Sequence, residues 1–117
     1  VTGGRYLLKP EGSSAASTFQ HDVDLLVRPA RSHPITAGLG PILIQDETYR
    51  GTWISPQAEV LLATDHPSSD GPVAWIGPYR KSRVVCIQLG HGREAHQHPA
   101  YRRLVYQAIQ WAAAKRP

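Results

Sequence analysis

The segment 82–92 (Ser-Arg-Val-Val-Cys-Ile-Gln-Leu-Gly-His-Gly) constrains the fold more than any other part of the chain. Its short apolar run, bounded by glycine, is typical of a buried strand inside a sheet that is covered on both faces. A polar loop (92–99) and a helical pattern (100–115) follow it. In open α/β sheets, ligands bind where such strands end. We therefore expect His91, at the end of this strand, to be a functional residue.

Four further strands are expected upstream of this segment, at 19–27, 42–45, 58–64 and 73–76. The last of them should pair with 82–92 as a hairpin, because only a tight turn separates the two. Pro34 suits the first position of a short helical turn, and Gly38 suits its end. Within 101–112 the apolar residues recur at spacings of three and four, which predicts a helix that covers one face of the sheet.

Length and composition exclude several classes of protein. The 117 residues suffice for one domain, and no segment approaches the roughly 20 apolar residues of a membrane span. The net charge is +4, with basic clusters at 80–83 and 102–103. Nucleic-acid-binding proteins usually combine such charges with aromatics on one face, whereas Arg102 and Arg103 fall on the expected solvent side of a helix, so we expect no nucleic-acid binding. The single cysteine, Cys86, lies mid-strand and is expected to be a buried apolar residue. The chain begins at Val1 and has no methionine, so we expect a processed or shortened chain, located in the cytoplasm.

An acidic pair and a histidine suggest acid–base chemistry. Asp46 and Glu47 directly follow the expected strand 42–45. His91 can move a proton with Glu47 or Asp46 as the second group, because imidazole and carboxylate can hold different protonation states near neutrality. A solvated acidic turn is the alternative interpretation of the pair.

A metal site is a second hypothesis for the same region. His91, His96 and His98 fall within eight residues of one another, with Glu94 between them. Imidazole and carboxylate ligands suit zinc or a similar divalent ion. The spacing matches no established zinc signature, so surface histidines are the alternative, and no other cofactor is indicated.

Several motifs, in order, resemble the ThuA-like family, which is named for trehalose utilisation. The resemblance runs from about residue 3 to residue 114. The matching segments are His-Pro-Ile-Thr-Ala-Gly-Leu (33–39), Asp-Glu-Thr-Tyr (46–49), Val-Leu-Leu (60–62), Pro-Val-Ala-Trp (72–75), Arg-Val (83–84), Leu-Gly-His (89–91) and Ile-Gln-Trp-Ala-Ala (109–113).

The resemblance implies an α/β fold of the flavodoxin-like type, similar to class I glutamine amidotransferases. The chain resembles only the second half of that fold, a mixed sheet with a C-terminal helix packed on it. The other half would supply the first parallel strands and the nucleophile position. A half-domain would expose apolar surface and an unpaired edge. We therefore expect a homodimer or larger assembly, or a separate N-terminal half that completes the sheet.

The resemblance also implies a sugar substrate, such as trehalose or its 3-keto form, and a hydrolase or isomerase activity. His91, Glu47 and Asp46 would then be catalytic, and the substrate-binding candidates are Tyr49, Trp75, His33 and Arg83. Other interpretations stay open: a core position for Trp75, a turn-fixing role for His33, and an ion pair with Asp46 or Glu47 for Arg83.

Two observations limit the catalytic hypothesis. No serine, cysteine or threonine occupies an evident strand-to-helix elbow, so amidotransferase activity is not expected. Gly71 and Gly92 stand where members of the family often have histidine and aspartate. The alternative function is therefore a non-catalytic sugar-binding or assembly module.

Overall fold

Five strands form the main sheet of this computed structural model, which describes residues 1–115. Every pairing within the sheet is antiparallel. The strands, in spatial order, are β3 (Ile42–Arg50), β2 (Thr18–Pro29), β5 (Glu59–Thr64), β6 (Pro72–Ile76) and β7 (Val85–Ile87). A separate two-stranded sheet and three helical segments complete the fold: β1 (Gly4–Arg5), β4 (Trp53–Ile54), η1 (Pro34–Thr36), α1 (Arg93–Gln97) and α2 (Pro99–Ala113).

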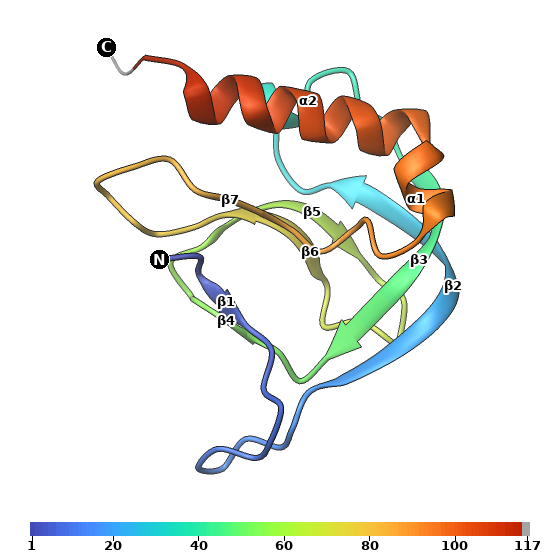
Figure 1. The fold of residues 1–117 in the computed structure, drawn as a ribbon, viewed down its shortest axis with the longest axis vertical. Coiled ribbons are helices and arrows are strands. Elements are labelled where there is room, and N and C mark those ends of the chain that lie inside the picture. Colours follow the sequence, from blue (N-terminus) through green and yellow to red (C-terminus); the bar gives the residue numbers. More distant parts are fainter. Residues whose placement is uncertain (116–117) are drawn as a thin grey trace.

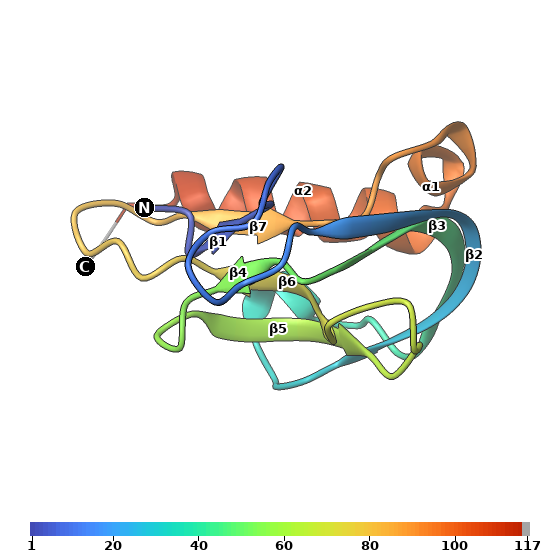
Figure 2. The same ribbon diagram turned by 90° about the horizontal axis from the view of Figure 1, so that it is seen from below.

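The core lies between the main sheet and α2, which runs along one side of it (Figures 1 and 2). Alternate residues of β2, Val23, Leu25 and Val27, are buried because successive side chains of a strand point to opposite faces. From α2, Leu104 and Ala108 enter the same core at a spacing of four, which places them on one face of the helix. The expected helix over the sheet is therefore present, as an α/β fold requires.

The long strands β2 and β3 curve strongly (Figure 1). As a result, the loop that follows β7 reaches β3, although the two strands lie at opposite ends of the hydrogen-bonding order. The smaller sheet packs against the indole of Trp75, at a point where only glycine fits. A Cβ atom on Gly4 would lie 2.4 Å from a ring carbon of Trp75.

Three sequence predictions need correction. The segment expected to be an interior strand forms β7, which is a half-buried edge strand of three residues. Asp46 and Glu47 do not follow a strand but lie within β3, and both are buried, so the solvated acidic turn is wrong. The loop at 92–99 contains the short helix α1. The hairpin of β6 with β7 and the turn at η1 are confirmed.

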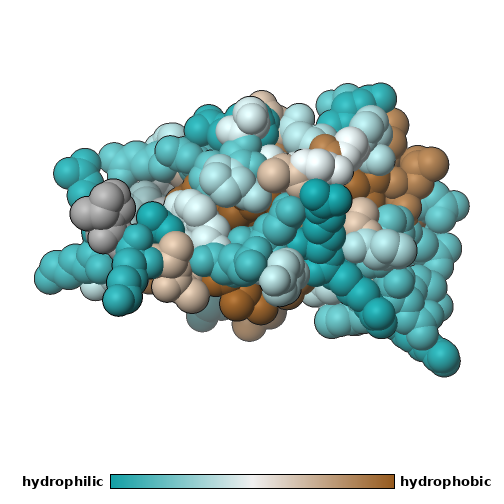
Figure 3. All heavy atoms as spheres, turned by 90° about the horizontal axis from the view of Figure 1, so that it is seen from above, coloured by the Kyte–Doolittle hydropathy of each residue, from teal (hydrophilic) through white to brown (hydrophobic). Residues whose placement is uncertain are grey.

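Hydrophilic residues cover most of the face on the α2 side, and hydrophobic ones show between them (Figure 3). The exposed apolar side chains include Leu43 of β3 and Ile109 of α2. Within 1–115, no helix is long and apolar enough to cross a membrane.

Candidate active site

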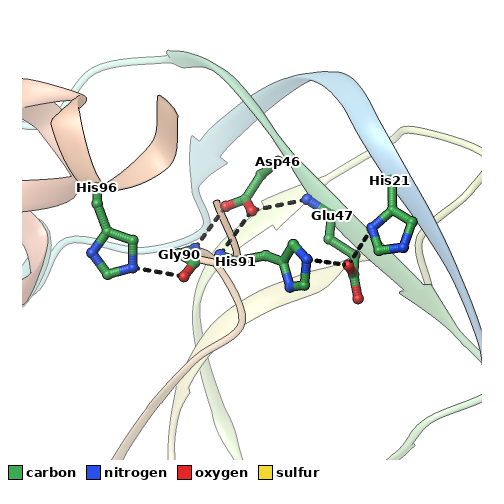
Figure 4. Close-up of polar contacts among 6 residues, drawn as sticks. All are labelled: His21, Asp46, Glu47, Gly90, His91 and His96. Carbon is green, nitrogen blue, oxygen red and sulfur yellow. Dashed lines mark hydrogen bonds and ion pairs between the residues drawn. The ribbon is translucent and has the colours of Figure 1, made fainter. Parts of the chain in front are cut away.

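Asp46 fixes the backbone of the loop that carries His91. Its carboxylate accepts hydrogen bonds from the backbone N–H groups of Glu47, Gly90 and His91, at 2.8, 2.7 and 3.1 Å (Figure 4). A buried carboxylate is costly unless it is hydrogen-bonded, and three N–H donors meet that need. Asp46 therefore acts through the backbone, and its role in the site is to position His91.

Glu47, the next residue, contacts the ring of His91 itself. Along β3 its side chain points to the face opposite that of Asp46. Its Oε2 atom lies 3.0 Å from His91 Nε2 and 2.7 Å from His21 Nδ1 (Figure 4). The carboxylate is 8% exposed, whereas the two imidazoles are about half exposed. The histidines thus cover the carboxylate and remain open to solvent.

A β-bulge in β2 places His21 beside Glu47. Gln20 pairs with Thr48 and Val23 pairs with Asp46, so two residues of β2, His21 and Asp22, lie opposite Glu47 alone. Asp22 adopts a positive φ of 54°, a left-handed conformation that aspartate tolerates better than most residues. Nothing in the sequence singles out His21, because the alternation of a strand contains no sign of an extra residue.

The three side chains form the one group within 1–115 with the composition and spacing of a metal site. Their ligand atoms all lie within 4.8 Å of one another. Glu47 Oε2 is inaccessible to solvent, and its two imidazole contacts lack the orientation of hydrogen bonds. Such geometry suits metal ligands, because each aims its lone pair at the ion instead of at a neighbouring ligand. Two histidines and one glutamate form a known ligand set of catalytic zinc.

Tyr49 is the next residue on the same face of β3 as Glu47. Burial, together with a hydrogen bond to Glu47 and the negative charge of that carboxylate, raises the pKa of Tyr49 to about 12. The phenol is therefore a neutral hydrogen-bonding group at physiological pH. Tyr49 also lines a cleft beside the site, which is described below.

His96 and His98 do not join His91 in a common ligand group. His96 Nε2 donates to the carbonyl of Gly90 at 2.8 Å. His98 uses both ring nitrogens: Nε2 donates to Leu43 O at 2.7 Å, and Nδ1 accepts from the Ala100 N–H at the start of α2. The expected set of His91, His96 and His98 is therefore wrong in geometry, because two of its members bind backbone groups instead.

His33 and Arg83 lie elsewhere, beside Trp111 of α2. The Nδ1 atom of His33 accepts from the Ile35 N–H and caps η1. Arg83 donates to the carbonyl of Trp111 and stacks over its ring at 4.7 Å. Of the interpretations left open, the turn-fixing role of His33 fits this geometry, and Arg83 contacts neither Asp46 nor Glu47.

Trp75 is a core residue that also lines a cleft. It is 4% exposed, and its indole N–H donates to Thr2 O at 3.0 Å. The cleft has a volume of about 400 Å³, and Tyr49 is also part of its wall. A larger hollow of about 720 Å³ is lined by residues between 29 and 39, and none of its lining residues is an aspartate or glutamate.

Comparison with solved structures supports the fold. A putative ThuA-like protein from Parabacteroides merdae is 20% identical, with a TM-score of 0.70, over 98% of this chain and 51% of that protein. A cytoplasmic protein from Salmonella typhimurium is 14% identical, with a TM-score of 0.65, over 94% of this chain and 45% of that protein. The chain thus spans about half the length of these structures.

Sequence comparison identifies the family. Curated protein sequences give no match. The family model for ThuA, described as trehalose utilisation, matches residues 1–112, which is nearly the whole chain. The chain therefore belongs to the ThuA family.

Proposed function

We propose that the chain acts on a small carbohydrate, trehalose or its 3-keto form, at a site formed by His21, Glu47 and His91. The family description supports the substrate class. The observation that carries the proposal is the buried Glu47 Oε2 atom, which two imidazole nitrogens approach at 2.7 and 3.0 Å. A carboxylate and two imidazoles at one point can hold a divalent ion or transfer protons near neutral pH.

A divalent ion such as zinc suits this group of side chains. The ligand atoms of tetrahedral zinc lie about 3.4 Å apart for bond lengths of about 2.1 Å, so small side-chain rotations would adapt the observed spacing. Three protein ligands leave a fourth position open, where an ion can polarise a sugar carbonyl or hydroxyl oxygen. The exposed edges of His21 and His91 give that position access from solvent.

Without an ion, the same atoms would transfer protons directly. On a 3-keto sugar, the carboxylate of Glu47 would accept the proton from the carbon beside the carbonyl. A protonated His91 would donate a proton to the carbonyl oxygen, which gives an enediol. The reverse transfers, to the other carbon, would complete an isomerisation. This chemistry requires one base and one acid, and the pair contains both.

Metal binding separates these two mechanisms. In a calorimetric titration of metal-free protein with zinc, we expect one ion to bind per chain. His21→Ala and His91→Ala should each weaken the affinity at least about tenfold. His66→Asn is the matched control, because it removes a histidine outside the group and keeps an oxygen that can accept from the Ser68 N–H.

Equal effects of the control and the site variants, or no saturable binding, would contradict the metal site. Proton transfer would then be tested by incubating the 3-keto sugar with the protein in deuterated water. Exchange of the C–H proton beside the carbonyl, lost in Glu47→Gln, would support direct acid–base chemistry.

A non-catalytic sugar-binding or assembly module is the second candidate. The glycines at 71 and 92 support it, because they remove polar groups that the resemblance leads one to expect near the site. It predicts saturable sugar binding without turnover or proton exchange.

The coverage of about half of each solved structure supports a further part of the proposal. We propose that the chain corresponds to the second half of a flavodoxin-like, amidotransferase-like fold. A second copy or an N-terminal half would then pack on the exposed apolar positions, and sedimentation would detect the second copy as a dimer.

A further inference from the structure

The cleft beside Tyr49 has an unusually aromatic wall. Tyr6, Tyr49, Trp53 and Trp75 all line it. Its volume of about 400 Å³ lies within the range of small-molecule sites, roughly 300–1,000 Å³. Tyr6 and Tyr49 meet edge to face with ring centroids 6.1 Å apart.

Among these four rings, Trp53 is the one whose position is not explained by packing in the core. Its side chain belongs to the two-residue strand β4 and is 52% exposed. Burial in the core therefore does not explain its position. A half-exposed indole in the wall of a cleft is available to a ligand, whereas Trp75 in the same wall is held by its hydrogen bond to Thr2.

The chemistry of the wall suits a neutral, ring-shaped ligand with hydroxyl groups. The faces of aromatic rings carry partial negative charge, and the C–H groups of a pyranose carry partial positive charge. Gln88 adds a carboxamide that can donate and accept hydrogen bonds. Arg5, the charged residue of the wall, is paired with Glu11, so the cleft offers little to attract an anion.

The cleft adjoins the group of His21, Glu47 and His91 through two connections. Tyr49 lines the cleft and lies two residues beyond Glu47 on the same face of β3. Gln88 lines the cleft on the segment that leads into His91. A ring bound in the cleft would therefore extend toward the Glu47 carboxylate.

We infer that this cleft is the sugar-binding subsite of the chain, in which Trp53 and Tyr6 contact a pyranose ring and Tyr49 orients it toward Glu47. This inference rests on the proposed function for its substrate class. It adds Trp53 and Tyr6 as specificity-determining residues.

Ligand-observed saturation-transfer NMR with trehalose, and with glucose for comparison, tests the inference. We expect wild-type protein to bind trehalose, and Trp53→Ala to weaken the affinity at least about tenfold. Trp53→Phe, which keeps an aromatic face, should restore most of it. Tyr106→Ala is the control, because this exposed tyrosine lies on α2, outside the cleft.

The outcomes separate this inference from the proposed function. Trehalose binding that is unchanged in both Trp53→Ala and Tyr6→Ala would overturn the subsite, while zinc binding and proton exchange could still support the site. Trehalose binding that is lost in Trp53→Ala but kept in His91→Ala would support the subsite even if the chemistry at Glu47 were disproved. Absence of any saturable binding of either sugar by wild-type protein would overturn the inference.

Discussion

Glu47 Oε2 lies 3.0 Å from His91 Nε2, although β3 and the loop after β7 are far apart in the sequence. The preceding residue, Asp46, binds the backbone of the same histidine. Two successive residues therefore hold His91 by its main chain and by its ring. This arrangement gives the site its geometry and leads to the following predictions.

Asp46→Asn should destabilise the protein and displace His91. The amide nitrogen of asparagine cannot accept from a backbone N–H, so a buried donor would lose its partner, at a cost of about 1–3 kcal/mol in the free energy of unfolding. Zinc affinity should fall roughly 10–100-fold, as it does when groups that orient metal ligands are changed. Denaturant unfolding and calorimetry measure the two effects. Asp24→Asn, on the exposed face of β2, is the control, and equal behaviour of the two variants would contradict the positioning role.

Gly90→Ala should disrupt the loop that carries His91. Gly90 has a φ of 106°, and a Cβ atom there would lie 2.3 Å from the hydroxyl oxygen of Tyr101. The backbone strain alone is worth about 1–3 kcal/mol, and the clash adds to it. Gly40→Ala should be tolerated, because a Cβ atom added at Gly40 would meet no atom within 4 Å beyond its chain neighbours. A melting temperature of Gly90→Ala equal to that of Gly40→Ala would disprove this account of the loop.

The bulge in β2 predicts different effects of two substitutions at Asp22. Asp22→Gly should leave stability equal or higher by up to about 1 kcal/mol, because glycine adopts a positive φ without strain. Asp22→Val should lower stability by about 1–3 kcal/mol, since a β-branched residue is strained there. Zinc affinity should persist in the glycine variant and fall in the valine variant. Equal affinities in the two would show that the bulge does not position His21.

The phenol of Tyr49 should titrate near pH 12 in the folded protein and near its ordinary value of about 10 in the unfolded chain. The folded state therefore favours the neutral phenol. This contribution to stability is complete below pH 10 and is lost as the pH rises toward 12. Glu47→Gln should lower the pKa of Tyr49, though not fully to 10, because burial remains. Phenolate absorbance as a function of pH measures this pKa, and Tyr49→Phe identifies which part of the signal belongs to Tyr49. A titration of Tyr49 that Glu47→Gln leaves unchanged would contradict the contact between the two side chains.

His33 should make the protein sensitive to mild acid. Burial, followed by the nearby cations Arg31 and Arg83, lowers the pKa of His33, while Glu59 opposes the shift. The unfolded chain then binds a proton first, so stability is complete above about pH 6.5 and decreases as the pH falls below it. His33→Asn keeps a side-chain acceptor for the Ile35 N–H and should reduce this pH dependence. The test compares the free energies of unfolding of the wild type and His33→Asn at about pH 7 and pH 5. An equal loss of stability in the two proteins between these pH values would refute the role of His33.

Much of the fold could be predicted from the sequence because its periodicities are strong. The three- and four-residue spacing within 101–112 corresponds to α2, and the alternation of 19–27 corresponds to β2. The interior position expected for β7 was wrong, because an apolar composition does not distinguish a central strand from an edge strand that α2 partly covers. The expected strand 42–45 is shorter than β3, because acidic residues usually indicate that a strand has ended. The sequence does not show the buried N–H groups that bind Asp46.

The candidate site could be predicted only in part. Glu47 and His91 were selected from their residue types and their positions beside apolar runs, and the structure brings them together. His21 depends on a bulge, which is decided by pairing with β3 and leaves no local pattern. His96 and His98 were grouped with His91 by proximity in sequence, but imidazoles also satisfy backbone carbonyls, and both do so here.

The opposite orientations of Asp46 and Glu47 tie the site to the register of β3. A slip of one residue would turn Glu47 inward and Asp46 outward, because side chains alternate along a strand. The same slip would expose Ile42 and Ile44, which belong to the core. A misregistered chain would therefore lose its core and its site together, so folding quality control that removes exposed apolar strands would also remove molecules that lack the site.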